Sequence, residues 1–170
     1  MARRISLREF QQGLVERLTS AQRGETPRAL LGIQAGSEHW LLELADSGEI
    51  VPLPHITPVP LTQPWFRGLA NIRGTLYTVV DFSAFQGAEA TPLNSEARLV
   101  LANSRFGFLS ALLVNKALGL RSLDSLEPRP GTPEARKWEG ELYADSQGRV
   151  WKKLLIRELF SDPGFLEIGV

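Results

Sequence analysis

The sequence predicts an all-β domain, built as a barrel or a sandwich, that carries short helical turns. From residue 29 onward, short runs rich in β-branched and aromatic residues recur, as strands require. Segments of Gly, Asn, Asp and Ser separate these runs, and many short strands joined by such turns favour a barrel or sandwich over an α/β fold. With 170 residues, of which 43% are hydrophobic and 22% charged, the chain is long enough to bury a substantial core.

Residues 1–27 are predicted to form a helical extension ahead of the β domain. Ser6 and Glu9 fit an S-x-x-E capping box, in which the two residues satisfy each other's backbone N–H groups. Apolar residues follow at helical spacing between Leu7 and Leu18. This apolar stripe can pack either on the rest of the protein or on a partner.

The β domain is predicted to contain short strands joined by turns of the Asp-Ser-Gly and Asn-Ser-Arg kind. In chain order, the predicted strands are Leu30–Gln34, Trp40–Leu44, Ile50–Pro52, Leu76–Val80, Arg98–Ala102, Phe106–Val114, Ala117–Ser122, Glu141–Ala144 and Arg149–Leu154.

Proline and loop segments interrupt this series of strands. Five prolines lie between residues 52 and 64, and proline cannot donate to a central β-ladder, so we expect an extended crossing segment there. A second loop is expected over residues 127–133. Near the end, Ile156–Phe160 is predicted to form a helical turn.

Residues 65–81, WFRGLANIRGTLYTVVD, form the most informative segment. The two Arg-Gly steps in it flank an apolar half-turn, Leu69-Ala70, and a strand-like run follows. Asp81 then fits the N-cap of a short helix, which Gly87 ends. We therefore expect a turn, a hairpin, a strand and a short helix, with the Arg73 guanidinium at the tightest bend.

Sequence signatures of an enzyme are absent. The chain has no G-x-S-x-G elbow, no phosphate-binding P-loop and no H-E-x-x-H motif. It has no cysteine, and its histidines, His39 and His55, have no partners at metal-ligand spacing. We expect no catalytic residue, no metal and no cofactor, although an enzyme of an unrecognised type stays open because distant residues can meet in a fold.

The charge balance argues against nucleic acid or an anionic membrane surface as a general partner. Nineteen basic and nineteen acidic residues cancel. No run approaches the roughly 20 apolar residues that a membrane-spanning helix requires. We therefore expect a cytoplasmic protein that neither inserts into the membrane nor binds nucleic acid.

Arg73 is the strongest candidate for a binding residue. A guanidinium offers five donors in a fixed fork, which suits carboxylate recognition or a protein interface. Alternatively, Arg73 forms an internal pair with Asp81 or Glu49. Glu49 is either a partner-facing acid or a solvated strand end, and Trp65 and Phe66 are either core residues or exposed anchors.

The residues quoted above resemble those of the CheW-like adaptor family, over about residues 28–168. The ungapped stretch Gly48–Phe82 is similar to the family arrangement E-I, then P, then G-x-x-N-x-R-G, then V-D-L. A second similarity covers Leu113–Leu120, which resembles the family's V-D-x-V-x-G-V. The resemblance implies a single domain over residues 28–168, made of two intertwined five-stranded SH3-like barrels around a shared core.

Within that family, the chain most resembles the adaptors of type IV pilus (twitching motility) chemosensory systems. The helical extension and the ending Gly164–Ile168 carry this similarity. The chain departs from the family at Thr78, where proline is usual, at Asn115, where an acid is usual, and at Val51-Pro52, where polar residues are usual. The last departure makes the expected partner-facing surface more apolar and suggests a dedicated partner.

The resemblance implies a non-catalytic adaptor between methyl-accepting chemoreceptors and a CheA-type histidine kinase. Its partners would be the kinase regulatory domain and the receptor cytoplasmic tip, so it would be recruited to membrane-associated receptor arrays. Flagellar chemotaxis and a small β-barrel that binds nucleic acid or a peptide are the alternatives. The residues expected to contact the partners are Glu49, Ile50, Phe66, Gly68, Asn71, Arg73 and Gly74.

Overall fold

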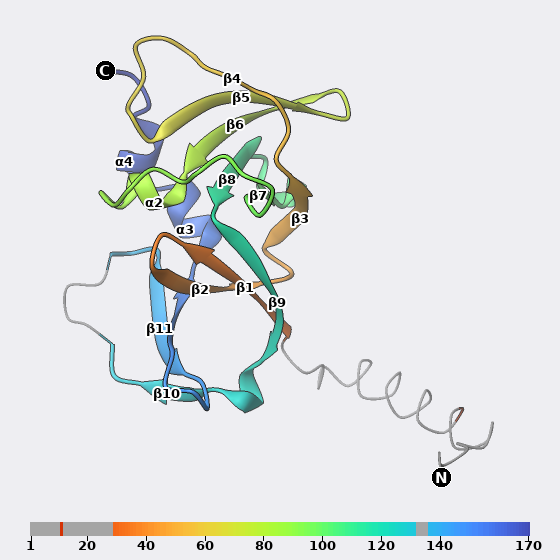
Figure 1. Cartoon of the computed structure of the whole chain (residues 1–170), viewed down its shortest axis with the longest axis vertical. Coiled ribbons are helices and arrows are strands. Elements are labelled where there is room, and N and C mark those ends of the chain that lie inside the picture. Colours follow the sequence, from red (N-terminus) through yellow and green to blue (C-terminus); the bar gives the residue numbers. More distant parts are fainter. Residues whose placement is uncertain (1–10, 12–28, 132–135) are drawn as a thin grey trace.

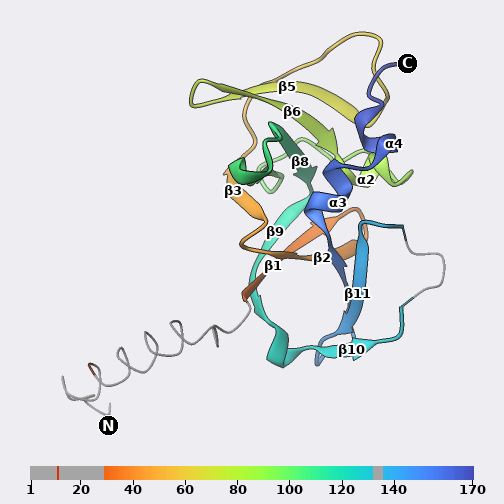
Figure 2. The same ribbon diagram turned by 180° about the vertical axis from the view of Figure 1, so that it is seen from behind.

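The strands form two mixed sheets, one above the other (Figures 1 and 2). A computed structural model of the chain describes residues 11, 29–131 and 136–170. Apart from residue 11, the predicted helical extension lies outside the described residues. The first sheet has the strand order β10-β11-β12-β2-β1-β9 and the second the order β3-β7-β8-β6-β5-β4. The predicted all-β class is confirmed.

The first sheet collects strands from both ends of the domain. Its strands are β1 (Ala29–Ala35), β2 (Glu38–Glu43), β9 (Lys116–Ser122), β10 (Glu127–Arg129), β11 (Glu139–Ala144) and β12 (Val150–Leu154). The strands of the second sheet are β3 (Ser47–Pro52), β4 (Ile56–Thr57), β5 (Phe66–Ile72), β6 (Thr75–Asp81), β7 (Arg98–Ala102) and β8 (Ser110–Val114). The second sheet is thus inserted between β2 and β9, so the two halves are intertwined.

Each sheet has six strands, where five-stranded barrels were expected. The short β4 and β10 lie at sheet edges. Each sheet also contains one parallel pair, β12 with β2 and β6 with β8, among antiparallel neighbours. The number of closed barrels stays a prediction.

Three hydrophobic clusters hold these sheets together. One cluster lies within the second sheet and includes Leu99 and Leu113, and another lies within the first sheet and includes Leu41 and Trp151. The largest cluster takes residues from both sheets and from the helices, with Trp138 among them. It forms the shared core, in which about 25 cal/mol is gained per Å² of apolar surface buried.

Short helices pack against the shared core. They are α2 (Phe82–Phe85), α3 (Ile156–Phe160) and α4 (Pro163–Leu166), with 3₁₀ turns at Ser104–Phe106 and Leu123–Ser125. As predicted, Asp81 caps α2 by accepting the Ala84 N–H at 3.2 Å, and Gly87 follows with φ 84°. The predicted turn at Ile156–Phe160 is confirmed as α3.

Three local predictions were wrong. The apolar pair Leu69-Ala70 is not a half-turn but lies inside β5, where Ala70 pairs with Tyr77. The strand predicted from residue 106 begins at Ser110, because a 3₁₀ turn and left-handed Gly107 precede it. The expected loop at 127–133 begins with edge strand β10, where Pro128 is tolerated because an edge strand has one unpaired side.

Candidate functional site

The tip of the β5–β6 hairpin presents Arg73. Ile72 pairs with Thr75, so Arg73 and Gly74 form a two-residue loop, with φ 50° and 86°. Positive φ at both loop residues is the pattern of a type I′ turn, which matches the twist of the flanking strands. The Asn71 side-chain oxygen accepts the Gly74 N–H at 2.9 Å. The N-x-R-G pattern therefore builds a turn that exposes an arginine.

Strand β3 presents Glu49 beside this tip. A β-carbon on Gly48 would lie 2.8 Å from the Ala102 carbonyl oxygen, so only glycine allows β3 to approach β7 so closely. The register shifts between Ser47 and Ile50, which is typical of a bulge that redirects a side chain. Glu49 is exposed, while Ile50 is half-buried against the shared core.

Arg73 and Glu49 form a two-pronged ion pair between these elements. Arg73 Nη1 donates to Glu49 Oε1 at 2.9 Å, and Nη2 donates to Oε2. Both side chains stay open to solvent, with exposed fractions of 69% and 48%. Hydrogen bonding to Arg73 lowers the pKa of Glu49, and the same hydrogen bond raises the pKa of Arg73. In the structure, Arg73 therefore forms the internal pair with Glu49 and not with Asp81.

Asp81 has a different role. It is fully buried, and its carboxylate accepts both the N–H and the hydroxyl of Thr91 at 2.7 Å. Arg67 lies 3.5 Å away. A buried carboxylate needs such partners to offset its desolvation. Asp81 thus fastens the segment after α2 to the end of β6 and is not the partner of Arg73.

Two of the predicted contact residues lie inside the protein. Phe66 is only 7% exposed and belongs to the shared core. Gly68 is buried, and a β-carbon there would lie 2.0 Å from the Thr57 carbonyl oxygen. Both residues belong to β5 and pack inside the domain, and the predicted residues that reach the surface are Glu49, Ile50, Asn71, Arg73 and Gly74.

Two exposed leucines near the hairpin were not among the predicted contact residues. Leu76 is 56% exposed and lies opposite Asn71 on β6. Leu109 is 53% exposed, and its carbonyl oxygen accepts the Thr78 N–H at 2.9 Å. Alternation along β6 does not single out Leu76, because residues two apart share a face and Val80 on that face is buried. We define the docking surface as Glu49, Asn71, Arg73, Gly74, Leu76 and Leu109.

In a comparison with protein families, residues 29–163 match the sequence model of the CheW-like domain family. The chain belongs to the CheW-like domain family. Protein PilI of Pseudomonas aeruginosa is 29% identical over 91 residues, which is 54% of this chain and 51% of PilI, so the match spans about half the length of that relative. The crystal structure of the scaffolding protein TtCheW from Thermoanaerobacter tengcongensis superposes with a TM-score of 0.67 and 20% identity. That superposition covers 82% of this chain and 96% of that one and shows the same fold.

The two histidines of this CheW-like domain lie in different surroundings. His39 packs edge-on against Trp151, with ring centroids 5.3 Å apart, and burial, followed by the charge of Arg149, lowers the pKa of His39. His55 is exposed. Among the described residues, no cluster of three or more His, Asp or Glu side chains could hold a metal ion. In the same residues, no helix has the length and apolar character to cross a membrane.

Replacing Arg73 by Gln is expected to raise the pKa of Glu49 toward its ordinary value of 4.5, because the hydrogen bonds that favour the carboxylate are lost. With Arg73 present, the pair contributes stability above that value and loses it as the pH falls through the lower pKa of the folded state. A carbon-detected NMR titration of the Glu49 carboxyl measures this change. Arg105→Gln, which removes the separate pair with Asp46, should leave Glu49 unchanged; an unmoved pKa in Arg73→Gln would contradict the pairing.

Proposed function

We propose that this protein is a non-catalytic adaptor that couples methyl-accepting chemoreceptors to a CheA-type histidine kinase in a type IV pilus chemosensory system. The observation that carries the proposal is the exposed Arg73–Glu49 pair, which lies on a CheW-like domain and joins a hairpin tip to a neighbouring strand. The similarity to PilI favours the pilus system over flagellar chemotaxis.

The composition of the docking surface supports a protein partner. Arginine is enriched among interface residues that carry binding energy. Leu76 and Leu109 add exposed apolar area close to the hairpin. Half-buried Ile50 connects this surface to the shared core. A surface with a fixed ion pair and neighbouring apolar groups can exclude water when a partner binds, which strengthens charged contacts.

The adaptor would act by position. The turn at Arg73-Gly74 is held by Asn71, and its tip is tied to Glu49, so the surface is preorganised before a partner arrives. One face would bind the receptor cytoplasmic tip, while another face of the domain would bind the kinase regulatory domain. The receptor state would then bias kinase activity through contacts that differ between the two states.

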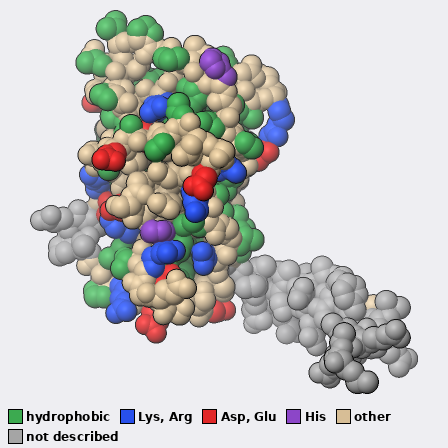
Figure 3. All heavy atoms as spheres, viewed as in Figure 1, with side chains coloured by type: hydrophobic (Ala, Val, Ile, Leu, Met, Phe, Trp, Pro, Cys, Tyr) green, Lys and Arg blue, Asp and Glu red, His purple; other side chains and the backbone are tan. Residues whose placement is uncertain are grey.

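We further propose that the adaptor domain spans residues 28–168, with a helical extension over 1–27, and that it works in the cytoplasm at membrane-associated receptor arrays. The family match at 29–163 falls within these bounds. The alternative of a nucleic-acid-binding barrel is disfavoured by the balanced charge. In the view of Figure 3, basic and acidic side chains are mixed over the described surface.

Co-purification tests this function. The full chain is mixed separately with the regulatory domain of a CheA-type kinase and with a receptor cytoplasmic tip, each taken from a pilus system and from a flagellar system. We expect the full chain to bind both pilus-system partners. Preferred binding to the flagellar pair would contradict the pilus assignment, and binding to neither pair would refute the adaptor function. Salt-dependent binding to oligonucleotides alone would favour the nucleic-acid alternative.

A further inference from the structure

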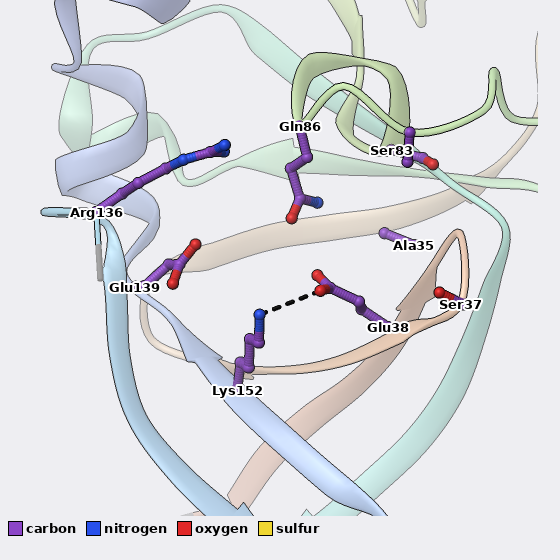
Figure 4. Close-up of a pocket in the computed structure, with 9 residues that line it drawn as sticks. Ala35, Ser37, Glu38, Ser83, Gln86, Arg136, Glu139 and Lys152 are labelled. Atoms are coloured by element: carbon purple, nitrogen blue, oxygen red, sulfur yellow. Dashed lines mark hydrogen bonds and ion pairs between the residues drawn. The ribbon is translucent and has the colours of Figure 1, made fainter. Parts of the chain in front are cut away.

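A second site lies between the two sheets, on residues that do not belong to the docking surface. It is a hollow of about 270 Å³. Three parts of the fold line it: the β1–β2 turn, α2 with the residues that follow it, and the start of β11 with β12. The charged and amide side chains that line it are Glu38, Gln86, Arg136, Glu139 and Lys152. Figure 4 shows these side chains converging on the hollow from its different walls.

Two of the four charged side chains in this hollow form an ion pair with each other. Lys152 Nζ donates to Glu38 Oε1 at 3.1 Å, and its ammonium group lies 5.4 Å from the centre of the Trp40 ring. Arg136 lies over the Trp138 ring at 5.2 Å. Within the described part of the chain, no ion pair or side-chain hydrogen bond joins Arg136 or Glu139 to another residue. The hollow therefore offers a guanidinium and a carboxylate that have no ion-pair partner among the described residues.

Trp40, Trp138 and nearby backbone hydrogen bonds fix the positions of the lining side chains. Trp40 and Trp138 are fully buried in the shared core, with ring centroids 5.7 Å apart, so both cations rest on a packed base. The Glu139 N–H donates to the Arg136 carbonyl oxygen at 2.9 Å, which fixes the two residues in one turn. Gln86 donates to the Phe82 carbonyl oxygen at 3.2 Å and keeps its own side-chain oxygen for a ligand.

We propose that this hollow binds a small zwitterion with the chemistry of a free α-amino acid. Its carboxylate would face Arg136, for which a guanidinium is the matching donor, and its ammonium group would face Glu139 and the Gln86 oxygen. The four charged side chains of the hollow sum to zero, so a ligand with both charges leaves no charge uncompensated. Pockets for drug-sized ligands measure about 300–1,000 Å³, and the smaller volume here suits an amino acid.

This site is independent of the adaptor function, because none of its residues belongs to the docking surface. A ligand there would touch α2, which follows the second sheet, and β11 and β12 of the first sheet. It would therefore join the two halves of the domain.

Calorimetry and NMR on the full chain test the proposal with glycine, L-glutamate and L-arginine as probes, and with acetate and ethylammonium as single-charge controls. At least one amino acid is expected to bind with a Kd below about 1 mM, and more tightly than either control. Arg136→Gln and Glu139→Gln should each weaken binding about tenfold. Arg129→Gln, on exposed strand β10, should not.

The wild-type protein provides a readout that needs no variant. The amide shifts caused by the bound amino acid should centre on Ser37, Gln86 and Glu139. Binding weaker than about 1 mM by all three amino acids would overturn the proposal. Shifts centred elsewhere, or unchanged affinity in both pocket variants, would overturn it as well.

Discussion

Gly68→Ala is expected to lower the free energy of unfolding by about 3–5 kcal/mol, because the new methyl group would meet the backbone of the neighbouring segment. The added β-carbon would lie 2.0 Å from the Thr57 carbonyl oxygen and 3.0 Å from the Pro58 α-carbon. Gly68 also has φ 130°, a conformation that a residue with a side chain rarely adopts. Relief would require β4 to leave β5, which would uncover part of the second sheet.

Gly87→Ala is the matched control for this prediction. Gly87 also has a positive φ, of 84°, but a β-carbon there would meet nothing within 4 Å. Only the left-handed backbone conformation is then unfavourable, at about 1–2 kcal/mol. Urea unfolding followed by tryptophan fluorescence compares the two variants. Equal losses would contradict the assignment of close backbone packing to Gly68.

Arg73→Glu is expected to weaken binding to the receptor tip at least about 100-fold, because it places two carboxylates face to face where the ion pair stood. The hairpin tip would then lose its tie to β3, and the docking surface would lose its cation. Stability should change little, since solvent-exposed ion pairs contribute little to the free energy of unfolding. Titration calorimetry of each variant with the receptor tip and the kinase regulatory domain measures the effect.

Arg129→Glu makes the same charge reversal on β10, outside the docking surface, and should bind as the wild type does. The unfolding midpoint of both variants confirms that each is folded. Undiminished binding of Arg73→Glu to both partners would remove Arg73 from the interface. Equal losses in Arg73→Glu and Arg129→Glu would point to a general charge effect instead.

The sequence predicted those parts of the fold whose causes are local. The Asp81 cap and the Gly87 ending of α2 depend on neighbouring backbone groups, so the residue types alone identify them. The requirement for glycine at position 68 was not predicted, because it comes from a close contact with the backbone of Thr57. Thr57 lies eleven positions away along the chain and reaches Gly68 only through the pairing of β4 with β5. A glycine in a strand and a glycine in a turn are alike in sequence, and only tertiary contacts distinguish them.

The candidate site was partly predictable for the same reason. Asn71 and Gly74 make their turn within four residues, so the exposed position of Arg73 followed from the pattern. The pattern did not decide between Glu49 and Asp81 as the partner of Arg73. That choice depends on how the second sheet brings β3 beside the hairpin tip. The amino-acid pocket gathers Glu38, Glu139 and Lys152 from distant parts of the chain, and no local motif indicates it.

The most direct test of the proposed adaptor function is the autophosphorylation rate of the CheA-type kinase, measured with and without the receptor tip and with and without this protein. We predict that the receptor changes the kinase rate only when the wild-type protein is present, and that Arg73→Glu abolishes this change. A receptor effect of the same size without the protein would contradict the proposal, as would a kinase rate that the wild-type protein leaves insensitive to the receptor.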